Sequence, residues 1–262
     1  MTTGELRLKV KNVHNRMLFD ESYVSGAFKL GKPIWRDGIP LYYLLHVGGG
    51  YVSGDEYVQQ IELRDHTTLY LTTQAATKVY KGDRPAKVQS NIKIGQHSHL
   101  SLLQDPIILY ENAMFHQHTV VELTKTSTFY FSEIITPGWS PSKQPFQYKE
   151  LYSELSIKRD GKLCYADRLF WQQDMQPQYL QLADYSHYGT FLCIEALPAT
   201  FFEAFEQWQT PGVEIGYSLL QDYGFVLKIA AFDTQQIEAV FQQLDDLLRA
   251  EKCREPLRLR KY

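Results

Sequence analysis

The chain has 262 residues, of which 44% are hydrophobic, and carries a formal net charge of -3 from 27 basic and 30 acidic residues. This length is enough to bury a substantial core, as one large domain or two small ones. The near-balanced charge excludes a broad basic surface for nucleic acid and a polybasic patch for a membrane.

Nothing in the sequence predicts export or membrane insertion. The first ten residues are polar and charged, unlike a signal peptide, and no run approaches the ~20 apolar residues that span a bilayer. The three cysteines, Cys164, Cys193 and Cys253, are far apart and form no CxxC pair. A reducing cytoplasm is therefore the expected location.

Residues 23–157 show mostly period-two hydrophobicity, interrupted by short turn signals such as Gly48-Gly49-Gly50 and Pro137-Gly138. Many short strands at close spacing predict a mainly β, mainly antiparallel architecture. Residues 151–165 predict a hairpin, because Asp160-Gly161 suits the positive φ angles of a tight primed turn.

The C-terminal part has a different pattern. It predicts a strand at 190–197, a helix to about Gln209 that begins with a Thr200/Glu203 capping box, strands at 213–220 and 225–232, and a helix from Asp233 or Thr234 to before Pro256. We therefore expect one domain over residues 1–262, with a β body at about 1–183 and a β-α-β-β-α end at about 184–262. No internal repeat is evident in the sequence.

Two segments suggest anion binding by their residue types. Residues 48–55 are the densest in glycine, but no Lys-Ser or Lys-Thr follows and the next residues look like a strand, so this is no P-loop. A structural turn is the simpler interpretation. Lys78, in a stretch of small polar residues, would meet an anion or an acidic partner, or be a solvated lysine at a strand end.

Two histidine pairs, His97/His99 and His116/His118, have the spacing that places both imidazoles on one face of a strand. Imidazole binds both nickel and zinc, so these pairs are the candidates for a static metal-binding module. The sequence offers no matching cluster of carboxylates or thiolates beside them.

A hydrolase is the other alternative, with His187 or Asp55 in the reaction. Asp184, Ser186 and His187 are too close in sequence to form a nucleophile–base–orienter geometry easily, and no G-x-S-x-G elbow is present. The residues by themselves thus favour a binding or scaffolding protein over an enzyme.

Three segments resemble the UreD (UreH) family of urease accessory proteins. Residues 46–55 resemble its GG-x-x-x-GD signature, residues 71–80 its TTQ-x-ATK-x-Y signature, and residues 105–113 its DP-x-I-x-x-x-x-A segment. Many members have Gly-Arg where this chain has Gly138-Trp139, so no arginine role is carried over to that position.

The resemblance implies a mainly β fold of packed, helically wound sheets with two helices, and a non-catalytic role in maturing the nickel centre of urease. It implies binding to UreF, recruitment of the GTPase UreG, docking on apo-urease, and a dimer within that complex. In the family, GTP hydrolysis by the partner drives nickel transfer alongside carbamylation of a urease lysine, and an internal tunnel is proposed as the nickel route. No cofactor is expected to bind tightly, and nickel only transiently.

Candidate binding residues follow from these motifs. Asp55, Thr77, Lys78, Asp105 and Glu111 are expected to line a passage or to hold the motif loops, and the remaining motif positions are Gly49, Gly50, Gly54, Gln74 and Tyr80. A passage that must release its ion favours scattered oxygen ligands over a tight histidine or cysteine site.

Overall fold

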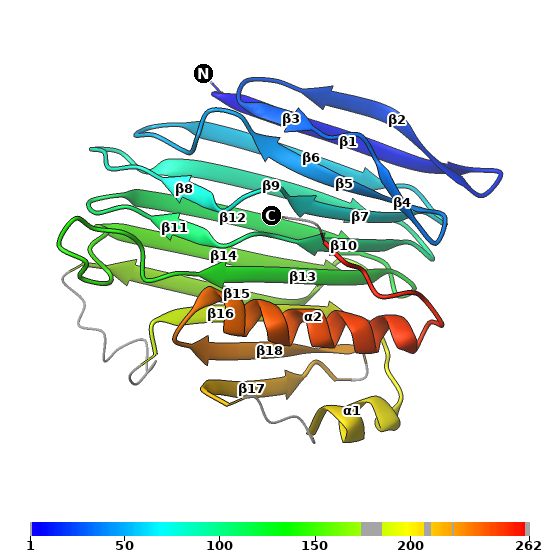
Figure 1. The fold of residues 1–262 in the computed structure, drawn as a ribbon. Helices are drawn as coiled ribbons and strands as arrows, with labels where there is room; N and C mark the ends of the chain where they lie inside the picture. The colour runs from blue at the N-terminus through cyan, green and yellow to red at the C-terminus, as the bar shows by residue number, and fades with distance from the viewer. Residues whose placement is uncertain (1, 174–184, 207–210, 222, 260–262) are drawn as a thin grey trace.

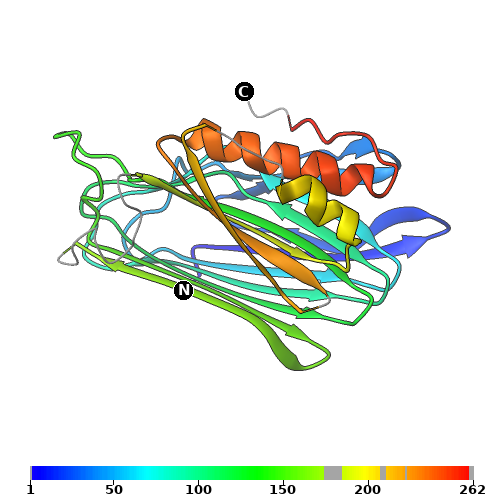
Figure 2. The same ribbon diagram turned by 90° about the horizontal axis from the view of Figure 1, so that it is seen from below.

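The computed structural model describes residues 2–173, 185–206, 211–221 and 223–259. In these residues the protein consists mainly of two β-sheets that face each other, with two helices on the outer side of one sheet (Figure 1, Figure 2). The mainly β class predicted from the sequence is confirmed. The predicted boundary near residue 183 lies outside the described residues.

The first sheet has seven strands in the order β15-β14-β12-β9-β6-β1-β2. Their bounds are β1 Gly4–Val13, β2 Arg16–Val24, β6 Glu56–Leu63, β9 Ala86–Ile94, β12 Met114–Leu123, β14 Glu150–Arg159 and β15 Lys162–Gln172. Alternate residues of β1, β9 and β14 are buried, which is the period-two pattern of a sheet with one covered face.

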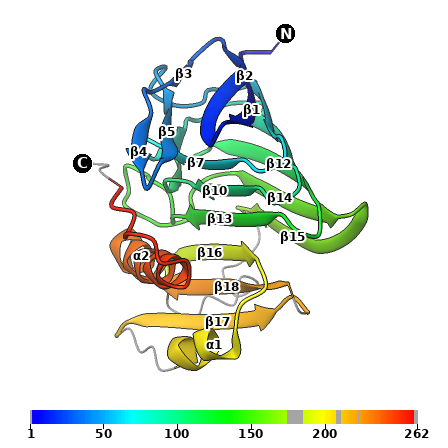
Figure 3. The same ribbon diagram turned by 90° about the vertical axis from the view of Figure 1, so that its right-hand side faces the viewer.

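The second sheet has eleven strands, and its main path runs β17-β18-β16-β13-β10-β7-β5-β3. These strands are β3 Phe28–Leu30, β5 Ile39–His46, β7 Thr68–Thr73, β10 His99–Leu103, β13 Thr128–Ile135, β16 His187–Ile194, β17 Val213–Leu219 and β18 Gly224–Ala231. Three short strands extend it: β4 Ile34–Arg36 on β5, and β8 Thr77–Val79 with β11 Ile107–Leu109 beside β13. Figure 3 shows the two sheets on opposite sides of the body.

The chain winds between the sheets, because β6, β9, β12 and β14 belong to the first sheet while β7, β10 and β13 belong to the second. Neighbouring turns of this winding are parallel. The helically wound arrangement is confirmed, but the expectation of mainly antiparallel pairing is wrong for the centre of both sheets. Antiparallel pairs join the strands outside the winding, including β1–β2, the predicted β14–β15 hairpin at Asp160-Gly161, and β13–β16 with the strands beyond it. Alternating hydrophobicity predicts a strand but does not specify its partner.

The winding also creates a structural repeat that the sequence did not reveal. Leu69, Leu100 and Phe129 pair with one another on adjacent parallel strands, each at the same position after a short turn. The turns themselves stack, since the amide of His66 donates to the carbonyl of Gln96 and that of His97 donates to Thr126 Oγ1. Some of these positions carry the same residue, as Leu69 and Leu100 do, but Phe129 takes the place of leucine in the third strand.

In the C-terminal part the elements follow in the order β16, α1 (Ala199–Glu206), β17, β18 and α2 (Thr234–Ala250). The predicted capping box at Thr200 is wrong, because α1 begins at Ala199 and Thr200 lies inside it. A capping box occurs at α2 instead, where Asp233 accepts from the amide of Gln236 and the Gln236 side chain accepts from the amide of Asp233.

Two apolar cores result from this layering. The larger one lies between the sheets and includes Leu8, Ile92 and Phe129. The second lies between the outer face of the second sheet and the helices, where Phe191 and Leu227 meet Leu244 of α2. Helix α2 covers β13, β16 and β18, and the segment after it crosses the same face (Figure 1).

Candidate functional site

The glycine-rich segment, residues 46–55, forms the connection from β5 to β6 and is held by the second motif segment. The amide of Tyr51 donates to the carbonyl of Lys78 over 2.8 Å, and the amide of Tyr80 donates to the carbonyl of Tyr51 over 2.8 Å. Gly50 has φ +145°, and a Cβ there would lie 2.6 Å from the Lys78 carbonyl oxygen. Only glycine allows this close approach of two backbones.

Asp55 and Gly54 lie within the same connection but do not line the cavity between the sheets that is described below. The Asp55 carboxylate accepts from the amide of Val52 over 2.9 Å and from the hydroxyl of Tyr57 over 3.4 Å. Gly54 has φ +75° and packs against the guanidinium of Arg84. In the structure, these two motif residues have a role in shaping the turn.

The second and third motif segments are joined by side-chain hydrogen bonds. Thr73 Oγ1 donates to Asp105 Oδ2 over 2.8 Å and accepts from the Asp105 amide over 2.7 Å. The amide of Thr77 donates to the carbonyl of Pro106, and β8 pairs with β11. Asp105 is only 2% exposed, so it fastens the two segments together and does not face an open passage.

Glu111 belongs to a third layer of the same end of the molecule. Its amide donates to the carbonyl of Trp139 over 2.7 Å, and the Trp139 amide donates to the carbonyl of Leu109 over 2.9 Å. Trp139 is 53% exposed and packs on Tyr110, which in turn packs on Tyr80. Trp139 is therefore the exposed end of a row of three aromatic rings, in which Tyr110 and Tyr80 are half-buried.

Beside these loops lies a cavity of about 440 Å³ between the two sheets. Five of the predicted motif residues line it, namely Gly49, Gly50, Gln74, Thr77 and Lys78, whereas Gly54, Asp55, Tyr80, Asp105 and Glu111 do not. Its inner wall carries polar side chains that the sequence analysis did not select: Gln59, Ser90, Gln104, Gln117 and Thr119. Polar groups inside a β core are expected to serve a purpose other than packing.

Deeper in the body, a second polar group connects the sheets. Gln117 of β12 donates to Glu133 of β13 and, over 2.8 Å, to Ser153 Oγ of β14. Gln117 also lines a narrow second cavity of about 10 Å³ with Glu133, Ser153 and Asp167. Burial raises the pKa of Glu133 to about 7, although its bond from Gln117 and the charge of Lys228 act in the opposite direction.

Glu133 and Asp167 were missed by the sequence analysis for a physical reason. Glu133 interrupts an apolar run in β13, and Asp167 alternates with apolar residues in β15, so both read as exposed strand positions. The sequence did contain an indication that Glu133 is buried and paired. It lies in an apolar run typical of a strand covered on both sides, where a charged side chain needs a polar partner.

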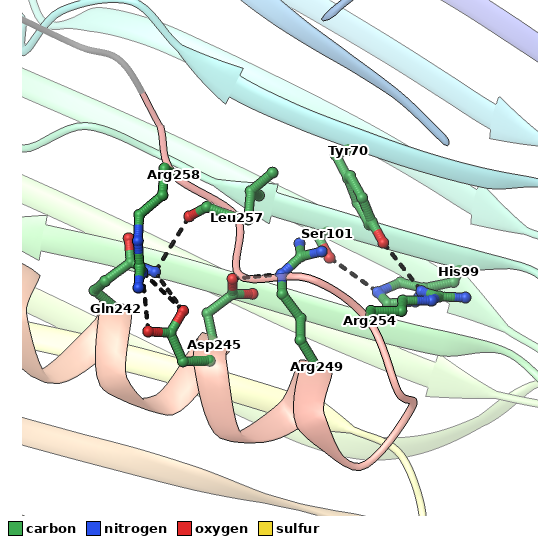
Figure 4. Close-up of polar contacts among 10 residues, drawn as sticks. Tyr70, His99, Ser101, Gln242, Asp245, Arg249, Arg254, Leu257 and Arg258 are labelled. Carbon is green, nitrogen blue, oxygen red and sulfur yellow. Dashed lines mark hydrogen bonds and ion pairs between the residues drawn. The ribbon is translucent and has the colours of Figure 1, made fainter. Parts of the chain in front are cut away.

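The histidine pairs do not form a metal site. His97 lies in a turn with φ +53°, stacked on His66, whereas His99 begins β10 and is 7% exposed, so the pair does not share a strand face. His99 bonds Ser101 and lies near Tyr70 beneath the segment after α2 (Figure 4). Desolvation, followed by the charges of Lys252, Arg254 and Arg249, lowers its pKa well below the usual range.

His116 and His118 share the outer face of the first sheet, but each contacts its own carboxylate, Glu150 and Glu154 respectively. Within the described ranges of the chain, no group of three or more histidine, cysteine, aspartate or glutamate side chains is arranged to hold a metal ion. The structure therefore offers no support for the static metal-binding module.

The hydrolase alternative gains no support from the position of its residues. His187 Nδ1 lies 2.9 Å from Ser186 Oγ, but that hydroxyl also donates to the carbonyl of Phe232. Neither residue lines the two cavities between the sheets. The Asp55 carboxylate accepts a hydrogen bond from the amide of Val52 within its own turn. None of the helices in the described part of the chain is both long and apolar enough to cross a lipid bilayer.

Comparison with known proteins agrees with this geometry. The family model described as UreD urease accessory protein matches residues 2–261. The chain is 35% identical over 260 residues to the urease accessory protein UreD of Bacillus sp. (strain TB-90), covering 95% of this chain and 94% of that protein. It is 33% identical over 261 residues to UreD of Bacillus cereus, covering 96% and 94%, and 32% identical over 271 residues to UreD of Lachnoclostridium phytofermentans, covering 99% and 98%. With this match along nearly its whole length, the chain belongs to the UreD family of urease accessory proteins.

Proposed function

We propose that this protein is a non-catalytic scaffold in the cytoplasmic maturation of urease, and that its interior is part of the route by which nickel reaches the apo-enzyme. The observation that carries the proposal is the cavity between the sheets. Two separate family motifs meet at it, and its polar inner wall leads by way of Gln117 to Glu133 and Asp167.

The chemistry of this wall suits a passing divalent cation. Amide and hydroxyl oxygens of Gln59, Ser90 and Thr119 are weak, hard or borderline ligands, which replace hydration water without holding the ion. A thiolate or clustered imidazoles would retain nickel instead. The spread of single oxygen donors along the interior therefore favours transfer over storage.

The membership of the UreD family supports a set of proposed partners, and the lack of a nucleotide-binding motif in the sequence agrees with a separate GTPase among them. We propose that UreF binds this chain, that UreG supplies GTP hydrolysis, and that the assembly, in which this chain occurs as a dimer, docks on apo-urease. A scaffold role agrees with motif residues that bond one another and with the names of the relatives, which are accessory proteins.

The direct test is co-expression of urease structural proteins and the accessory proteins with and without this chain, followed by urease activity and nickel content. Activation that is equal in both cultures would contradict the scaffold role.

The nickel route is tested by Ser90→Phe, which fills the cavity, with Gln89→Phe on the exposed side of the same strand as the control. We expect Ser90→Phe alone to lower nickel incorporation while accessory complexes still form.

A further inference from the structure

A partly exposed ion pair joins the two sheets at the far end of the polar wall, where the two side chains are 30% and 35% exposed. Lys228 of β18, in the second sheet, contacts the carboxylate of Asp167 on β15, in the first sheet. The Lys228 ammonium also donates to Thr190 Oγ1 over 3.0 Å and lies 5.2 Å from the centre of the Tyr188 ring. Asp167, Thr190 and Tyr188 all line the narrow cavity that contains Glu133.

This lysine stays charged in its partly buried site. Desolvation acts to lower its pKa, but Tyr188, Tyr165 and Asp167 more than offset it, so that the pKa lies above its ordinary value. The Lys228 charge acts to lower the pKa of Glu133, whereas the charge of Asp167 acts to raise it. The ammonium therefore contacts one carboxylate, Asp167, and acts through its charge on a second, Glu133, which lines the same narrow cavity.

We propose that Lys228 is a tethered cation that occupies the place of the divalent cargo beside Asp167 and Glu133, and so prevents these carboxylates from retaining the ion. The inference rests on the proposed nickel route and adds to it the residue that makes the route one of transfer. A nickel ion that reaches this point must displace the ammonium from Asp167, and the ammonium returns when the ion leaves.

The surrounding groups explain why removal of the lysine has a measurable effect. Without the ammonium, two carboxylates remain with the oxygens of Thr190, Ser153 and Gln117 nearby, a set of donors that a divalent cation prefers to water. With the ammonium present, its positive charge already neutralises Asp167, so the same donors bind a divalent cation only weakly. Lys228 is thus a positioning residue that sets affinity.

The experiment is equilibrium dialysis of the full-length chain against NiCl2. We expect weak retention by the unmodified chain and about tenfold tighter retention or more, at one nickel per chain, by Lys228→Met. Lys228→Gln keeps a hydrogen-bond donor for Thr190 and Asp167, and provides a second neutral variant in which the fold is supported. Lys93→Met is the matched control, because Lys93 also pairs with a carboxylate, Glu122, but on the exposed surface.

Two further variants test the origin of any gain. Lys228→Arg keeps the charge and is expected to retain nickel as weakly as the unmodified chain, and Lys228→Met with Asp167→Asn is expected to return to that level. Folded Lys228→Met and Lys228→Gln chains that bind nickel no more tightly than the unmodified chain would overturn the inference. The proposed function is judged separately by urease activation with and without the chain, so the failure of one is distinguishable from the failure of the other.

Discussion

The amide of Tyr51 donates a hydrogen bond of 2.8 Å to the carbonyl of Lys78, and this contact helps to bring two family motifs to the mouth of one cavity. The contact requires the chain to pass very closely at Gly50, which has φ +145°. Backbone geometry thereby explains Gly50, while the polar side chains that line the cavity come from the second motif, such as Gln74 and Lys78, and from other strands.

Gly50→Ala is expected to be strongly destabilising. The new Cβ would lie 2.6 Å from the Lys78 carbonyl oxygen, in a backbone conformation that side chains avoid, and we expect a loss of about 2 kcal/mol or more in the free energy of unfolding. Gly49→Ala is the matched control, because Gly49 has φ +78° with open space around it, and its cost should be nearer 1 kcal/mol. Urea unfolding of both variants measures the difference, and equal costs would contradict the close-approach argument.

The Thr73–Asp105 pair provides a second prediction. Thr73→Val removes the hydroxyl that both donates to and accepts from the buried Asp105, so we expect a loss of about 2–3 kcal/mol in unfolding free energy. Thr73→Ser keeps both hydrogen bonds and should cost less than about 1 kcal/mol. Thermal or urea unfolding decides, and a Val variant as stable as the Ser variant would show that the pair does not fasten the motif segments.

The raised pKa of Glu133 predicts a pH-dependent stability. The pKa of this carboxyl is near its ordinary value of 4.5 in the unfolded chain and is raised by burial to about 7 in the folded one. The folded state therefore binds more protons between these values, and stability falls as the pH rises from about 4.5 through about 7.

Glu133→Gln removes this dependence, so the variant should gain stability relative to the unmodified chain as the pH increases. Urea unfolding at several pH values between these limits, and one above them, measures the gain. Parallel curves for the two proteins would mean that Glu133 titrates in the folded chain as it does in the unfolded one.

The buried Asp245–Arg249 pair on α2 gives a prediction for the C-terminal layer (Figure 4). The two side chains are 5% and 4% exposed and are joined over 2.6 Å, and the Arg249 guanidinium lies 4.5 Å from the centre of the Tyr70 ring. Arg249→Met leaves a buried carboxylate without its cation and should cost about 3–5 kcal/mol. Asp245→Leu with Arg249→Met should restore most of this loss. Calorimetry on the single and double variants tests it, and additive losses would contradict the coupling.

Much of the fold follows from local sequence. Period-two burial in β1, β9 and β14, the Asp160-Gly161 turn and the apolar stripe of α2 each depend on residues close together in the chain. The pairing of strands does not, because a parallel neighbour is separated by a whole turn of the winding. For this reason a mainly antiparallel architecture was predicted, whereas the wound strands pair in parallel and antiparallel pairs join the strands outside the winding.

The residues of the candidate site likewise fall into those that the sequence identifies and those that only the tertiary structure brings together. The sequence by itself determined the mainly β class, the turns that need glycine, and the motif segments that show the family. Only the tertiary structure decided that Gln74 and Lys78 open onto a cavity while Asp105 is buried, and that Glu133, Asp167 and Lys228 meet inside. A side chain's role in a passage depends on which strands face each other across it, and that is set by the packing of two sheets whose contacting residues are far apart in the chain.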